Sequence, residues 1–155
     1  MVLSALMPAN RTAIKIALHT GLRIGDVLSI KTDTFKQRFW ITEAKTGKRK
    51  MVALTKKLYW EALEGAGEIW VFPGRDPMKH RTRQAVWQDV KRAAKAYRMP
   101  QNVAPHSVRK LYAVRLMKKY GDIEKVKKAL NHNDISTTMI YALADRIIDN
   151  MRLLP

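Results

Sequence analysis

Apolar residues recur at helical spacing along most of this chain, and they alternate in one short region. The first predicted helix begins with an N-cap at Asn10 and runs to about Thr20, with Ile14, Ala17 and Leu18 on its inward face. Apolar periodicity, with Thr, Asp or Pro at the start or Gly at the end, predicts further helices over residues 22–28, 55–64, 82–97, 106–120 and 122–130. A last turn opened by Ser136 and a C-terminal helix over residues 144–153 complete the pattern.

Alternation of large apolar and polar residues marks two short strands, at residues 39–43 and 51–54. The basic stretch between them contains Gly47 and is typical of a turn, so we predict a β-hairpin with a cationic tip. A short extended piece at residues 70–72 ends at Pro73. No repeat, low-complexity run or long linker interrupts the chain. We therefore expect one domain over residues 1–155 in an α+β fold, mainly α-helical with a small antiparallel β-hairpin.

The charge of the chain points to an anionic partner. Its 155 residues include 30 Lys and Arg against 13 Asp and Glu, a net charge of +17, while a hydrophobic fraction of 46% indicates a folded globule. Nucleic acid is the first candidate and an anionic membrane surface the second. Because the basic residues are spread along the chain, we expect a broad docking surface rather than a disordered arm. The candidate contacts to double-stranded DNA are Lys48, Arg49, Lys50, Arg81 and Arg83.

The composition also excludes several kinds of chemistry. The chain contains no cysteine, which rules out disulfides and thiolate metal sites. No apolar run approaches the roughly 18 residues of a membrane span, and no signal-peptide pattern is present, so we expect a cytoplasmic protein. No dense cluster of Asp and Glu accompanies the motifs described next, so neither a metal nor another cofactor is predicted.

Two arginine motifs could bind a phosphate group. Arg23 follows Gly21 and could simply pair with Asp26, three residues on. Alternatively, its planar guanidinium could hold two phosphate oxygens, with Asp26 or a backbone carbonyl fixing its orientation. His106 and Arg109 lie one helical turn apart on the same face, a common arrangement. Pro105 favours a function here, because it starts the helix and places His106 near a positive helix end.

Lys45, Lys48 and Lys50 cluster on the tip of the predicted hairpin. A solvated charged turn is the better explanation on local grounds alone, but a lysine at the tip could also protonate a departing 5′-oxygen. Lys45 is favoured because it lies on the strand side of the turn, and Lys48 remains a competitor. Further along, His132 could cap carbonyl groups or hydrogen-bond a phosphoryl oxygen. Tyr141 could be an amphipathic core-edge residue or a nucleophile. Two arginines, two histidines, a lysine and a tyrosine together form the inventory for phosphoryl transfer without a metal.

The motifs TGLRIGDVLSI, APHSVRKLYAVRL and ALNHNDISTTMIYA, in this order and spacing, resemble the catalytic domain of the tyrosine recombinases, the phage integrase family. The resemblance runs from about Leu3 to the C-terminus. It implies DNA recombination or integration, typical of mobile genetic elements, through a 3′-phosphotyrosyl intermediate. It also implies the role of each site residue: Arg23 and Arg109 clamp the phosphate, Lys45 is the general acid, His106 assists proton transfer, His132 hydrogen-bonds the phosphate, Tyr141 is the nucleophile and Asp26 is a supporting acidic residue.

The chain departs from the family pattern in two places. The family commonly has Leu-Gly-His where this chain has Leu130-Asn131-His132, and Asn tolerates the same left-handed backbone. Full recombinases also carry a separate N-terminal core-binding domain, and the residues before Arg23 leave no room for it. We therefore expect an excised catalytic fragment, or otherwise a minimal family member.

Residues after Tyr141 form an apolar stripe at helical spacing: Leu143, Ile147, Ile148, Met151, Leu153 and Leu154. The stripe could pack on the domain's own core. The resemblance suggests instead that it docks into a neighbouring protomer, which would give a homo-oligomer on DNA. Two other functions remain possible: a nicking-closing enzyme like the type IB topoisomerases, and a non-catalytic DNA-binding module. The complete set of six residues argues against the binding module.

Overall fold

The computed structural model describes residues 2–98 and 105–130 of the chain. Within these residues the fold is mostly helical, with one two-stranded antiparallel sheet, which confirms the predicted class. The elements are η1 (Val2–Ala5), α1 (Pro8–Thr20), α2 (Ile24–Leu28), β1 (Arg38–Thr42), β2 (Arg49–Ala53), α3 (Lys56–Glu64), α4 (Arg83–Ala96), α5 (Pro105–Tyr120) and α6 (Ile123–Leu130). The predicted turn at Ser136 and the helix over residues 144–153 lie outside the described residues.

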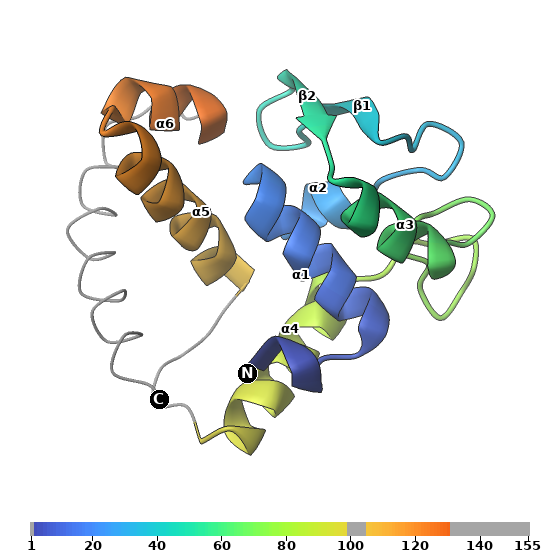
Figure 1. Ribbon diagram of the computed structural model, residues 1–155. Coiled ribbons are helices and arrows are strands. Elements are labelled where there is room, and N and C mark those ends of the chain that lie inside the picture. The colour runs from blue at the N-terminus through green and yellow to red at the C-terminus, as the bar shows by residue number, and fades with distance from the viewer. Residues whose placement is uncertain (1, 99–104, 131–155) are drawn as a thin grey trace.

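One extensive apolar core joins the helices from α1 to α4 with the hairpin. Its most deeply buried large side chains are Phe72, Ile16, Leu22, Leu28, Val27 and Val86. Helix α1 is central, since it packs against α2, α3 and α5 (Figure 1). Ile14 and Ala17 of α1 are buried, as the periodicity predicts, and Leu18 packs at the edge of the core.

The predicted start of α1 is wrong. The helix begins at Pro8, with Met7 as N-cap, and Asn10 lies inside it and is buried. The reason is Asp89 of α4, whose Oδ2 accepts hydrogen bonds from the Met7 backbone N–H and from Asn10 Nδ2, both at 2.8 Å. A carboxylate distant in sequence therefore caps the helix start, and Pro8 suits the first turn because it needs no donor there.

The local capping predictions for α3 and α4 are confirmed. The Thr55 hydroxyl accepts a hydrogen bond from the Leu58 N–H at 3.3 Å, and the Thr82 hydroxyl accepts one from the Ala85 N–H at 3.1 Å. Between these helices, the extended piece pairs as an isolated bridge of Trp70 with Lys31. This bridge ties the loop to the chain just after α2.

The hairpin forms as predicted, with its strands paired from Arg38 opposite Ala53 to Thr42 opposite Arg49. Phe39 and its partner Val52 are buried, while Trp40 and its partner Met51 are exposed. The second strand begins two residues earlier than its apolar alternation indicates, because main-chain pairing continues through basic residues. The turn covers residues 43–48 and contains Gly47 at φ 67°, a left-handed conformation that favours glycine.

Helices α5 and α6 form a second, smaller unit on one side of the molecule (Figure 1). Their shared cluster contains the buried Ala113, Val126 and Leu130. The Asp122 carboxylate caps α6, accepting from the Glu124 N–H at 2.9 Å, as predicted. No helix in the described part of the chain has the length and apolar character needed to cross a membrane.

Candidate active site

Arg23 is positioned by the sharp junction between α1 and α2. Gly21 closes α1 in the left-handed region at φ 71°, and Arg23 is the N-cap residue of α2. A Cβ added at Gly21 would clash with the Tyr112 ring on α5. Glycine is therefore required here both by the backbone and by the close approach of α5, which brings the helix carrying Arg109 against the Arg23 junction.

The partner of Arg23 is a residue that sequence reasoning missed. Arg23 Nη1 donates to Oε2 of Glu43, whose side chain is fully buried, with 0% exposure, at the end of β1. The predicted partner, Asp26, instead accepts a hydrogen bond at Oδ1 from the Ala44 N–H at 3.0 Å. Asp26 thus holds the hairpin turn, and Glu43 holds the guanidinium. One feature of the sequence could have indicated this role of Glu43: it is the only acidic residue between Asp33 and Glu61.

Arg109 approaches the same junction from α5. Its Nη1 donates to the Gly21 carbonyl at 2.9 Å, and its Nη2 donates to the Leu130 carbonyl at the end of α6. Burial and the nearby charge of Arg23 lower the pKa of Arg109, while Glu43 and Asp26 oppose this shift. A bound anion would relieve the repulsion between the two guanidinium groups. The structure therefore brings the two arginines of the predicted clamp together.

One donor and one acceptor at this junction are buried without a hydrogen-bond partner among the described residues. They are Arg109 Nε and Asp26 Oδ2. Because a guanidinium has five N–H donors and the two carbonyl groups occupy two of them, Arg109 keeps donors for a ligand. The backbone contacts fix the plane of the guanidinium, which is the preorganisation that phosphate binding requires.

The three hairpin lysines have different environments. Lys45 and Lys48 are exposed on the turn, and the Lys45 backbone lies two residues beyond Glu43. The sequence predicts Lys50 on the exposed tip, but it lies instead on β2, with its Nζ turned inward. That nitrogen donates to the carbonyls of Thr20 and Ala129, both at 2.7 Å. The predicted role of Lys50 as a surface contact to DNA is therefore wrong, because its ammonium is engaged inside the protein.

The remaining arginines predicted to contact DNA differ in their exposure and in their neighbours. Arg49 is exposed beside Trp40, with its guanidinium carbon 5.1 Å from the ring centroid. Arg83 is exposed at the start of α4, and its Cδ lies 3.2 Å from the position a Gly25 Cβ would occupy. Arg81 is half-buried and donates to Asn10 Oδ1 at 3.3 Å. Arg83 thus flanks the helix that follows Arg23, whereas Arg81 is tied to the helix packing.

The other predicted site residues are placed only in part. His106 is in the first turn of α5, three residues before Arg109. His132 and Tyr141 lie outside the described residues. Helix α6 ends at Leu130, and the Arg109 guanidinium contacts the Leu130 carbonyl, so the described part of the chain reaches the arginine junction two residues before His132 in the sequence.

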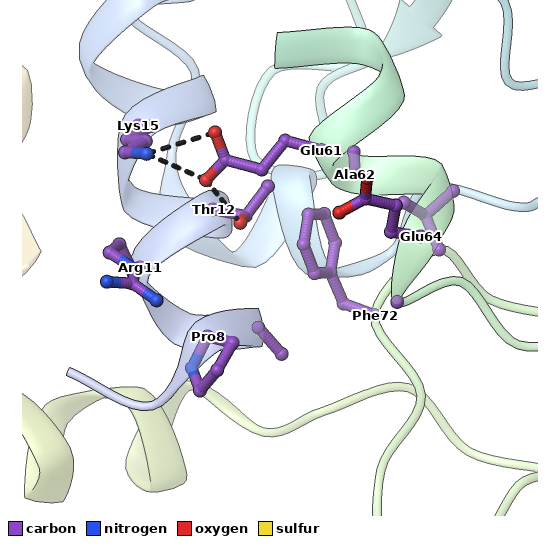
Figure 2. A pocket seen from close by; sticks show the side chains of 11 residues that line it. Pro8, Arg11, Thr12, Lys15, Glu61, Ala62, Glu64 and Phe72 are labelled. Atoms are coloured by element: carbon purple, nitrogen blue, oxygen red, sulfur yellow. Dashed lines mark hydrogen bonds and ion pairs between the residues drawn. The ribbon is translucent and has the colours of Figure 1, made fainter. Parts of the chain in front are cut away.

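A cavity of about 450 Å³ lies elsewhere, against the first half of α1 and the end of α3. Figure 2 shows the ion pair between Lys15 and Glu61 at its edge, with Phe72 on its apolar side. Its lining includes none of the candidate site residues. The candidate chemistry is therefore at the opposite, C-terminal end of α1, where basic groups converge.

Comparison with known proteins identifies the family. A model of the phage integrase family matches residues 4–146, and the chain belongs to this family. It is similar to the tyrosine recombinase XerD of Rhizobium meliloti (strain 1021), with 33% identity over 149 residues that cover 88% of this chain and 48% of that protein. The chain thus spans about half the length of the curated relatives it matches.

Solved structures share the fold. The lambda integrase catalytic core has a TM-score of 0.65 and 22% identity, over 80% of this chain and 83% of that one. The XerH site-specific recombinase bound to its difH substrate has a TM-score of 0.70 and 23% identity, over 87% of this chain and 42% of that one.

Proposed function

We propose that this chain is the catalytic domain of a site-specific DNA recombinase or integrase that cuts and rejoins DNA through a 3′-phosphotyrosyl intermediate. The observation that carries the proposal is the convergence of Arg23 and Arg109 on the α1–α2 junction, each held by a fixed partner. Two oriented guanidinium groups beside each other match the oxygens of one phosphodiester. Membership of the phage integrase family supports the assignment of the reaction.

In the proposed reaction, the Tyr141 oxygen attacks phosphorus and forms a bond to the 3′-phosphate. The bond from phosphorus to the 5′-oxygen breaks, and Lys45 supplies the proton that this oxygen needs. His106 assists proton removal from the tyrosine, and His132 hydrogen-bonds the phosphate. Attack by a 5′-hydroxyl of another strand reverses these steps, so the broken bond is restored without an external energy source.

Double-stranded DNA is the proposed partner. Similar structures hold DNA: XerH with its difH substrate, and lambda integrase as a dimer on a core site and as a tetramer on a Holliday junction. For this chain, the net charge of +17 and the exposed Lys48, Arg49 and Arg83 support the same partner. We propose that protomers assemble on DNA through the apolar stripe after Tyr141. The names of the matching relatives favour recombination over a topoisomerase-like reaction.

Incubation with a nicked duplex that traps the cleaved state tests this function. The wild-type chain should form a covalent protein–DNA adduct that leaves a free 5′-hydroxyl. Tyr141→Phe should form none while still binding DNA, because only the attacking oxygen is lost. Tyr120→Phe is the matched control, since Tyr120 is exposed on α5, and it should react normally. An adduct that persists in Tyr141→Phe would contradict the proposal.

A further inference from the structure

The C-terminal ends of α1 and α6 meet beside the candidate active site. The last carbonyls of a helix lack partners within the helix and carry the negative end of its dipole. Two such ends brought together repel each other and leave acceptors unsatisfied. In this protein two cations lie between them, and each donates to one carbonyl from each helix end.

The two cations bind consecutive carbonyl groups at each helix end. Lys50 Nζ donates to Thr20 and Ala129, and Arg109 donates to the next residue in each case, Gly21 and Leu130. Both Lys50 contacts are 2.7 Å long. Lys50 therefore bridges the same two chain segments as Arg109, from a third element, β2.

The bridge joins the parts of the proposed active site that lie far apart in sequence. The α1 end leads into Arg23, and the α6 end leads toward His132. Lys50 is on the strand that follows the Lys45 turn. We propose that Lys50 is a positioning residue: its charged amine ties the hairpin and the α1–α2 junction to the end of α6, and so holds the phosphate clamp against the helix that precedes His132 in the sequence.

The environment of Lys50 makes this role sensitive to pH. Burial is the main cause that lowers its pKa, to about 8; Arg109 lowers it further and Glu43 raises it. The Tyr112 ring of α5 lies 5.8 Å from the amine. Below about pH 8 the amine is charged and attracts both carbonyls; above this pH it loses the charge and the bridge weakens. An arginine at this position would keep its charge.

The kinetic test of this inference rests on the proposed function, because it measures the rate at which the trapped covalent adduct forms. Lys50→Met should slow adduct formation about 10-fold to 100-fold, the scale of a small misplacement of reacting groups, with DNA affinity unchanged. Lys50→Arg should recover most of the rate. Lys56→Met, an exposed lysine of α3, is the control for loss of one positive charge. A wild-type rate in Lys50→Met would overturn the inference.

The pH profile separates positioning by charge from mere packing. The rate of Lys50→Arg relative to wild type should rise from about pH 7 to about pH 9, because only the wild type loses its charge there. The ratio cancels any pH dependence of the reaction that the two proteins share. A ratio that does not change with pH would overturn the role of the charge.

Hydrogen exchange tests the bridge without any reaction. In the DNA-free protein, Lys50→Met should speed exchange at the end of α6, and Lys50→Arg should restore protection. If the wild type forms no adduct, the proposed function fails, and hydrogen exchange alone decides the bridge. Unchanged α6 exchange in Lys50→Met would overturn it.

Discussion

The two parts of this molecule are held together in different ways. Helices α1 to α4 and the hairpin share an extensive apolar core, whereas α5 and α6 share a small cluster around Val126. The first part encloses a buried carboxylate, Glu43, which neutralises Arg23. Beside the end of α6, cations join the two parts, because Arg109 of α5 donates to the Gly21 carbonyl and Lys50 of β2 donates to the Ala129 carbonyl.

The proposed active site lies across this joint. Arg23 and Lys45 belong to the well-packed part, while Arg109 and the chain leading to His132 belong to the smaller unit. Apolar contact still anchors the start of α5, where Val108 packs against the larger core. The difference indicates that the arginine clamp keeps its shape only while the two parts stay docked. Arg109 therefore both binds the phosphate and links the two parts, whereas Arg23 only binds the phosphate.

The largest expected effect is the loss of Arg109. Arg109→Ala should slow adduct formation about 1,000-fold and Arg23→Ala about 100-fold, because each removes a preorganised donor and only Arg109 also links the two parts. Lysine should rescue either position poorly, since it cannot make a bidentate contact. Single-turnover rates on the nicked duplex measure both. A milder effect of Arg109→Ala than of Arg23→Ala would contradict the difference between the two parts.

The effect of replacing Lys45 on the cleavage rate should depend on the leaving group alone. The Lys45 turn belongs to the well-packed part, so the substitution should not disturb the contact between the two parts. Lys45→Ala should slow cleavage about 100-fold on a normal phosphodiester, within the range of general acid catalysis. A 5′-bridging phosphorothiolate should restore the rate, since a thiolate leaves without protonation. Lys48→Ala tested on both substrates is the matched comparison. If only Lys48→Ala were rescued, the general acid would be Lys48.

The smallest expected effect concerns stability. Val27 of the large core and Val126 of the small cluster are both fully buried, at 0% exposure. Each Val→Ala substitution should lower the free energy of unfolding of its own part by about 2 kcal/mol. Hydrogen exchange should show Val126→Ala loosening α5 and α6 alone, and Val27→Ala loosening the whole molecule. Equal effects of both on every helix would show that the two parts unfold as one.

Local signals in the sequence predict much of this fold. The caps at Thr55, Thr82 and Asp122 are confirmed because each depends on donors within the next three residues. Asn10 is wrong as a cap because Asp89, far away in the chain, takes over that task. Helix starts are therefore predictable where the cap is local, and not where another helix supplies it.

The same distinction between local and distant determinants applies to the candidate active site. Motif order predicts that Arg23 and Arg109 belong together, and the structure brings both to Gly21. It does not predict the buried partner Glu43, nor the inward turn of Lys50, because both depend on which helix ends meet in three dimensions. Alternation along β2 places Lys50 on the same face as the buried Val52, but the apolar pattern predicts a strand that begins only at Met51, so it does not extend this signal to Lys50.

The most direct test of the proposed reaction is to locate the tyrosine that carries DNA. Trypsin cuts this sequence after Lys128 and Arg146, so residues 129–146 form one peptide in which Tyr141 is the only tyrosine. Mass spectrometry of the trapped adduct should find the nucleotide remnant on this peptide, linked through a 3′-phosphate. A remnant on the peptides that carry Tyr112 or Tyr120 would contradict the proposed mechanism.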